Sequence, residues 1–160
     1  MKLSNILKKS QKGFTLIELL VVIGILAVLL AITLIAINPA RQFSQANNTK
    51  RRSDVNAILN AVNQYMADNK GLLPAGGIDV TDKPIQKSAV PADDADICAA
   101  LVPTYIAALP ADPQVNNGAA VTVCTADYVT GYNIIKSATS NRITVSAPTV
   151  ELSDPISVTR

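Results

Sequence analysis

Hydrophobic residues are gathered into one long run near the start of the chain. The run covers residues 14–37, in which only Thr15, Glu18, Gly24 and Thr33 are not strongly apolar. As an α-helix it would be about 36 Å long, which is enough to cross a hydrocarbon core of about 30 Å. The pattern therefore predicts a transmembrane helix over residues 14–37.

The next part, residues 38–70, predicts a helix with one apolar face. Its apolar residues recur at helical spacing, namely Val55, Ile58, Leu59, Val62, Tyr65 and Met66. Pro39 cannot donate a backbone hydrogen bond, so we expect one long helix to kink or loosen there. Gly71 favours an end of the helix just after Asn69. Residues 47–54 are polar all round, which is typical of a solvated neck.

The last part, residues 71–160, alternates short apolar runs with turn signals at residues 130–131 and 140–141. The runs that predict strands are 120–125, 131–136 and 142–147. Three or so antiparallel strands packed on the apolar helix face would bury both surfaces. We therefore expect an α+β body with a small antiparallel sheet on the outer half of a long N-terminal helix.

Composition argues against an enzyme. The chain has no His, which removes the Ser-His-Asp and Cys-His arrangements and imidazole metal sites. No other residues build a recognisable nucleophile or oxyanion site. The chain is 49% hydrophobic but only 4% aromatic, so its apolar excess is aliphatic. We expect a structural protein with no required cofactor.

Charge predicts the orientation of the membrane helix. Residues 1–13 contain four lysines, Lys2, Lys8, Lys9 and Lys12, and no acidic residue. By the positive-inside rule this leader stays in the cytoplasm, and residues 71–160 lie outside the inner membrane. The body without the leader is mildly acidic, which makes nucleic acid an unexpected partner.

A secretory signal peptide and a plain membrane anchor are the simplest alternatives for residues 1–37. The apolar run is longer than a signal peptide core, and no A-x-A-like site follows it. A plain anchor does not explain Glu18, because a carboxylate inside a membrane helix costs about 2.5 to 3.5 kcal/mol. Cleavage between Gly13 and Phe14 would create an amino group four residues before Glu18.

Residues 12–20, with the sequence KGFTLIELL, resemble the processing site of type IV pilins and type II secretion pseudopilins. This resemblance implies that a prepilin peptidase cleaves after Gly13 and methylates the new amine of Phe14. It also implies that Glu18 pairs with the Phe14 amine of a neighbouring subunit during assembly. The same families have the long kinked helix and small sheet expected above.

The resemblance further implies a subunit that leaves the inner membrane and polymerises into a surface pilus. Its partners would be other copies of itself, an assembly platform, minor pilins and the lipid bilayer. One alternative is a pseudopilin of a type II secretion system, because residues 68–74 and 105–113 resemble major pseudopilin segments. A more distant alternative is a DNA-uptake or adhesion minor pilin.

Three smaller groups of residues suggest additional sites. Cys98 and Cys124 are the only cysteines, and an extracytoplasmic body favours a disulfide between them, whereas a reducing compartment would leave two buried thiols. The second group, a basic cluster, consists of Lys50, Arg51 and Arg52. It could bind DNA, but we expect it to be a solvated neck or to touch lipid headgroups, because no aromatic residues interleave with it.

An acidic cluster raises the question of calcium. Asp93, Asp94 and Asp96 lie together in the sequence, and calcium takes several oxygen ligands. The spacing of an EF-hand is absent, so a solvated acidic loop or a helix start is the alternative. The resemblance to major pseudopilins, which carry a calcium site in a loop, draws attention to Asp112 and Asp127, although neither can be assigned.

Overall fold

The computed structural model describes residues 13–89, 93–152 and 155–160. The chain divides into two compact units with the boundary after Ala40. In chain order the elements are α1 (Leu16–Ile37), α2 (Pro39–Asp68), β1 (Lys83–Lys87), α3 (Cys98–Leu101), the short turn η2 (Asn116–Gly118), β2 (Tyr128–Lys136), β3 (Ile143–Ala147) and β4 (Ile156–Thr159).

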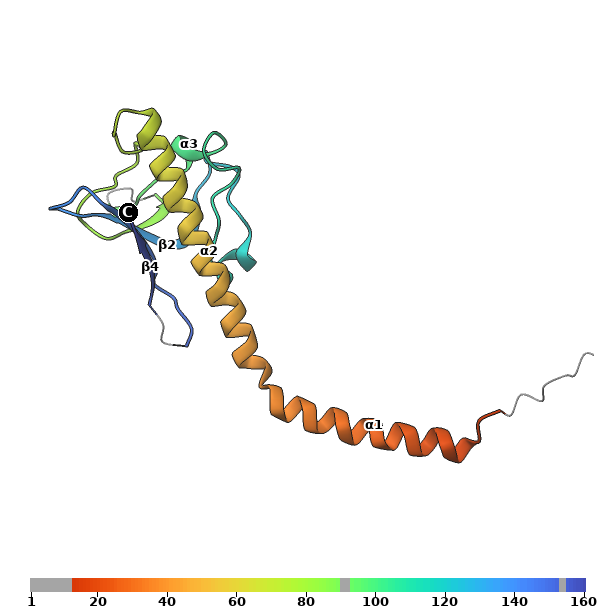
Figure 1. Cartoon of the computed structure of the whole chain (residues 1–160). Helices are drawn as coiled ribbons and strands as arrows, with labels where there is room; N and C mark the ends of the chain where they lie inside the picture. Colours follow the sequence, from red (N-terminus) through yellow and green to blue (C-terminus); the bar gives the residue numbers. More distant parts are fainter. Residues whose placement is uncertain (1–12, 90–92, 153–154) are drawn as a thin grey trace, which may run out of the picture. The chain divides into compact units, whose positions relative to one another are not determined.

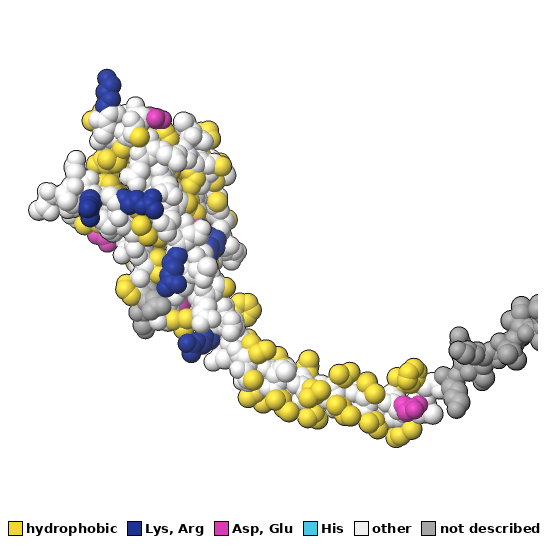
Figure 2. Space-filling model, viewed as in Figure 1, with side chains coloured by type: hydrophobic (Ala, Val, Ile, Leu, Met, Phe, Trp, Pro, Cys, Tyr) yellow, Lys and Arg dark blue, Asp and Glu magenta, His cyan; other side chains and the backbone are white. Residues whose placement is uncertain are grey.

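Helix α1 is the predicted apolar helix. It has 22 residues, and its length and composition suffice to cross a membrane. Among the described residues, no side chain of α1 is buried, and Figure 2 shows hydrophobic side chains along its whole length. A helix that is apolar on all sides needs lipid or other helices around it.

The expected weak point near Pro39 is an interruption of the helix at Asn38. Asn38 has φ 44° and ψ 79°, in the left-handed region, and α2 begins at Pro39. Proline disfavours the helical conformation of the residue before it but fits the first position of a new helix. The break therefore lies one residue before the proline.

Helix α2 ends where the sequence predicts. Its last residue is Asp68, and Gly71 has φ 84°. The Gly71 N–H donates a 2.7 Å hydrogen bond to the Met66 carbonyl, which satisfies one of the unpaired carbonyls at the helix end.

The four strands form one antiparallel sheet in the order β1-β2-β3-β4. The α+β architecture is thus confirmed, and β2 and β3 cover two of the three predicted strands. The third prediction, residues 120–125, is wrong. None of these residues is buried, and only Val121 pairs, in an isolated bridge with Leu109. Val121 and Cys124 are only partly buried against the core, and a single bridge does not make a ladder of backbone hydrogen bonds.

Two of the strands were not predicted, for different reasons. Strand β1 has the sequence KPIQK, with a proline and two lysines around the buried Ile85. Strand β4 has only four residues. Neither carries enough alternating apolar residues to be recognised without its neighbour.

The predicted turn at Thr130 and Gly131 is also wrong, because both residues lie inside β2. The register between β1 and β2 shifts here, with Pro84 opposite Asn133 but Gln86 opposite Val129. The extra residues form a bulge, and Gly131 has φ 78°. A bulge and a turn both use glycine for this conformation, so the sequence signal is the same.

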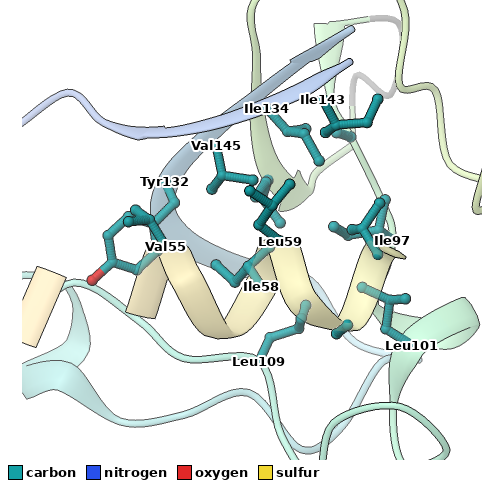
Figure 3. Close-up of a cluster of buried hydrophobic side chains, with 14 of the residues drawn as sticks. Val55, Ile58, Leu59, Ile97, Leu101, Leu109, Tyr132, Ile134, Ile143 and Val145 are labelled. Atoms are coloured by element: carbon teal, nitrogen blue, oxygen red, sulfur yellow. The ribbon is translucent and has the colours of Figure 1, made fainter. Parts of the chain in front are cut away.

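The core lies between α2, the sheet and the segment around α3. Figure 3 shows Val55, Ile58 and Leu59 of α2 gathered with side chains of the sheet and of the α3 segment. The labelled partners are Ile97, Leu101, Leu109, Tyr132, Ile134, Ile143 and Val145, all almost fully buried. The predicted apolar face of α2 is therefore the centre of this core, and Figure 1 shows where α2, α3 and the strands lie in the body.

Candidate functional site

The start of α1 has a capping box made by Thr15 and Glu18. Thr15 is the N-cap, and its Oγ1 accepts a hydrogen bond of 3.3 Å from the Glu18 N–H. In return the Thr15 N–H and hydroxyl each donate to Glu18 Oε2, both at 2.7 Å. Threonine followed three residues later by glutamate forms this reciprocal arrangement at helix starts.

Gly13, Phe14 and Glu18 lie together around this exposed helix start. The side chain of Phe14 is 84% exposed, and no atom lies within 4 Å of the position that a Cβ on Gly13 would take. Within the described residues, the Gly13 backbone and the Phe14 side chain thus have open space beside them. The roles predicted for these three residues in cleavage, methylation and pairing stay predictions.

Residues 8–34 match a family described as the prokaryotic N-terminal methylation motif. The chain carries the signature of type IV pilins and pseudopilins. The signature supports a pilin-like or pseudopilin subunit that a prepilin peptidase processes. Comparisons with curated proteins and with solved structures gave no match.

The pilin-type body contains the predicted disulfide. Cys98 and Cys124 are bonded, with their Cα atoms 5.3 Å apart. Cys98 begins α3 and is buried, whereas Cys124 lies in the segment that precedes β2. The bond therefore ties a segment with little regular structure to the core.

The solvated neck that the sequence predicts holds for Lys50 and Arg52 of the basic cluster, which are exposed, but is wrong for Arg51. Arg51 is completely buried, and its Nε and Nη2 donate to the two carboxylate oxygens of Asp112 at 2.6 and 3.1 Å. Lys50 donates to Asp54 at 2.7 Å and to the Ala111 carbonyl at 2.8 Å. Ala111 and Asp112 pack on this part of α2 and remove Arg51 from water. The DNA-binding alternative therefore loses its central cation.

A larger polar network surrounds the Arg51–Asp112 pair. Arg51 also donates to Asn48 Oδ1 at 3.0 Å, and that same oxygen accepts the Glu151 N–H at 3.1 Å. Asp112 accepts further bonds from the Gln114 N–H and the Thr149 hydroxyl, at 2.8 and 3.2 Å. The network joins α2 to the loop after Ala111 and to the chain between β3 and β4.

Electrostatics within the network favour the charged pair. Burial raises the pKa of Asp112, but hydrogen bonds from Arg51 and Gln114 outweigh it and hold that pKa below its usual value. The hydrogen bond to Asp112 raises the pKa of Arg51. Burial, and then the hydrogen bond to Asp54 at 2.7 Å, raises the pKa of Tyr132.

In the acidic cluster considered for calcium, the carboxylates of Asp94 and Asp96 accept hydrogen bonds from donors of the protein itself. Asp94 accepts bonds from Gln86 and Ser88 at 2.7 and 2.6 Å, which lower its pKa, Ser88 more than Gln86. Asp96 accepts the Tyr128 hydroxyl at 2.9 Å. Within residues 13–89, 93–152 and 155–160, no group of three or more acidic or Cys side chains is arranged to hold a metal ion.

The buried network was not predicted from the sequence, although the position of Arg51 on α2 is one indication of it. Arg51 lies four residues before Val55 and seven before Ile58, so it continues the apolar face of α2 by one turn. A charged side chain at such a position either lies beyond the last packing contact of the helix, where it is exposed, or is buried with a partner of opposite charge. The partner, Asp112, is 61 residues away and has no local mark.

Proposed function

We propose that the protein is a subunit that polymerises through α1 into a pilus-like filament after its leader is removed. The observation that carries this proposal is an exposed apolar helix whose charged residue, Glu18, lies at its start within the methylation motif. In the membrane the hydrocarbon tails surround α1, and in a filament the helices of other copies replace them. The proposed site of action is the inner membrane, with the body outside it and the filament on the cell surface.

Glu18 supports assembly because its carboxylate is costly in an apolar environment unless it is paired. Within the single chain, Thr15 supplies the hydrogen bonds of this carboxylate. These are neutral donors, whereas the amine created at Phe14 of an added subunit would be a cation. Adding a subunit in the correct register thus supplies a stronger partner than the monomer has.

The test is Glu18→Ala in the native host, with Thr33→Ala as the matched control. Thr33 is also a polar residue of α1, but its hydroxyl bonds the Leu30 carbonyl of its own helix. We expect both variants to lose residues 1–13 and to enter the membrane. Only Glu18→Ala should lose sheared surface filaments. A normal filament yield from Glu18→Ala would contradict the pairing.

The mass of the mature protein tests the processing step separately. We expect loss of residues 1–13 and one added methyl group on Phe14. An intact Met1 in the membrane fraction would contradict processing, and the protein would then be an anchored domain.

A pseudopilin of type II secretion is the second candidate, favoured by the resemblance of residues 68–74 and 105–113 to major pseudopilins. Deletion of the gene and shearing of the surface separate the two roles. Loss of exported proteins without sheared filaments would favour the pseudopilin. Sheared filaments with normal export would favour the pilus.

A further inference from the structure

The two edges of the sheet differ in how their backbone is protected. Strand β1 contains Lys83, Pro84 and Lys87 within five residues, and the Pro84 carbonyl accepts the Ala95 N–H at 2.9 Å. Lysine, proline and a covering segment are the devices that keep an edge strand from pairing with another chain. Strand β4, with the sequence ISVT, has no charged residue and no proline. Of the two edges, β1 is thus protected and β4 is not.

The backbone of β4 has hydrogen-bonding groups on its open side. Ile143 and Arg160 exchange two backbone bonds, of 2.7 and 3.0 Å, and such pairs alternate with non-hydrogen-bonded pairs in an antiparallel ladder. Ser157 and Thr159 occupy the alternate positions, so their N–H and C=O groups point away from β3. Within the described part of the chain no hydrogen bond uses these groups, and both residues are exposed.

A second edge of this kind lies in residues 119–123. Val121 exchanges backbone bonds of 2.7 and 2.9 Å with Leu109, which directs the backbone groups of Ala120 and Thr122 to the opposite side. The described residues provide no partner for these groups either. From residue 114 to residue 126 the sequence has no charge and no proline. The segment therefore has the composition of a strand but lacks a neighbour on one side.

A second copy of the chain is the occupant that fits both edges. The polymer of the proposed function needs a contact between two different surfaces, because such contacts repeat into open filaments. The β4 edge and residues 119–123 are two such surfaces, and pairing them satisfies the backbone groups of both. Two β4 edges paired with each other would instead close a symmetric dimer, which does not continue.

Charge favours a parallel arrangement of the two segments. Arg160 directly follows β4, and Asp127 follows residues 119–123 with three residues between. Both side chains are exposed. Arg160 donates to Asn60 Oδ1, which leaves further donors on its guanidinium group. Parallel strands bring the cation and the carboxylate to the same end, whereas antiparallel strands separate them.

We propose that residues 119–123 of one copy bind the open edge of β4 of the next copy as an added parallel strand. This inference rests on the filament of the proposed function, and it adds a contact between the bodies to the contact between the α1 helices. A pair of such short strands is smaller than the interfaces of about 1,200 Å² or more that hold stable complexes. The bodies therefore pair only where α1 keeps the copies close together.

Crosslinking in sheared filaments tests the pairing. Full-length chains with Val123→Cys are co-expressed with chains that carry either Ser157→Cys or Thr159→Cys, because the direction of the backbone groups permits both registers. The filaments are treated with a short bismaleimide, which reacts with thiols and leaves the native disulfide intact. We expect crosslinked dimers from at least one of the two mixtures, and none from any of the three variants expressed alone.

The matched control replaces the β4 variant by Thr139→Cys, at an exposed position between β2 and β3, and should give no dimers with Val123→Cys. Dimers from Ser157→Cys alone would show that β4 pairs with β4, and would overturn the proposal. Normal filaments without dimers from either mixture would also overturn it, while the proposed function stands. If the unmodified protein forms no sheared filaments, the surface filament is contradicted, and the pairing with it.

Ser157→Pro tests the backbone bonds directly. The Ser157 N–H points away from β3, so proline removes a donor of the open edge without removing a bond of the sheet. We expect the body to unfold at an unchanged urea concentration. Each contact between copies should weaken about fivefold through the loss of one hydrogen bond, which lowers the yield of sheared filaments.

Val158→Pro is the matched control, because its N–H faces β3 and its loss should destabilise the body itself. An unchanged filament yield from a stably folded Ser157→Pro would contradict the added strand. If Ser157→Pro also destabilises the body, the crosslinks decide.

Discussion

Arg51 and Asp112 are joined by two hydrogen bonds and are both inaccessible to solvent, although 61 residues separate them. Burying two charges is costly, and the cost is offset only where geometry is good and the remaining polar atoms are bonded. Here Asn48, Gln114 and Thr149 complete the bonding. No buried side-chain nitrogen or oxygen lacks a partner within the described residues.

Breaking this pair on one side should destabilise the body strongly. We expect Arg51→Met to lower the free energy of unfolding by about 3 to 5 kcal/mol, because the carboxylate of Asp112 is left buried and unpaired. The double variant Arg51→Met with Asp112→Leu should lose less than either single variant. Urea unfolding of the full-length protein in detergent, followed by near-ultraviolet circular dichroism, measures this. Arg142→Met, at an exposed site, should change the free energy by no more than about 0.5 kcal/mol.

Stability should fall on the acid side because the folded carboxylates have lowered pKa values. The lowered pKa of Asp112 means that its contribution is complete above its unfolded value of 3.8 and is lost as the pH falls towards the folded value. The pKa of Asp94 is also lowered, so its contribution to stability is likewise lost as the pH falls. Urea unfolding between about pH 3 and pH 7 should be flat near neutrality and decline below about pH 4.

The matched comparison for the acid decline is Asp112→Asn, which keeps the shape but cannot be protonated. Its free energy of unfolding should be lower at pH 7 and should depend less on pH below about pH 4. A slope equal to that of the unmodified protein would show that other carboxylates cause the decline.

Gly131 should tolerate alanine poorly for two separable reasons. It has φ 78°, and a Cβ there would lie 2.9 Å from Asp112 Cβ and 2.9 Å from Val115 Cγ2. Gly71 has φ 84° but nothing within 4 Å of a Cβ, so Gly71→Ala isolates the backbone cost of about 1 kcal/mol. We expect Gly131→Ala to destabilise the protein more than Gly71→Ala does, because the bulge and the loop that carries Asp112 must move apart to make room for the Cβ. Thermal unfolding of both variants measures the difference, and equal losses would contradict the crowding.

The disulfide should contribute substantially to stability. Cys98 and Cys124 are 26 residues apart in sequence, and closing a loop of this length is worth about 3.5 kcal/mol in the chain-entropy model. Replacing both by alanine should lower the free energy of unfolding by an amount of that order. Unfolding of the unmodified protein with and without a reductant gives an independent value. A loss below about 1 kcal/mol in both experiments would show that the loop is already ordered without the bond.

The sequence by itself determined the features that depend on neighbouring residues. The apolar run of α1, the capping residues Thr15 and Glu18, the break before Pro39 and the end of α2 at Gly71 all follow from local sterics and hydrogen bonding. The apolar face of α2 follows from spacing. The family signature is also local, since residues 8–34 carry it.

Only the tertiary structure decided the features that join distant segments. From the sequence alone Arg51 is interpreted as a surface cation, and only the fold brings Asp112 to it. Gly131 is likewise interpreted as part of a turn, and only the pairing of β1 with β2 shows that it lies in a bulge. Strands β1 and β4 are short, and they exist because neighbouring strands supply their hydrogen bonds. Residues 120–125 have a strand pattern, but within them only Val121 forms a bridge, and no neighbouring strand extends it. In each case the energy that decides the outcome comes from a contact made across the fold, which local patterns do not contain.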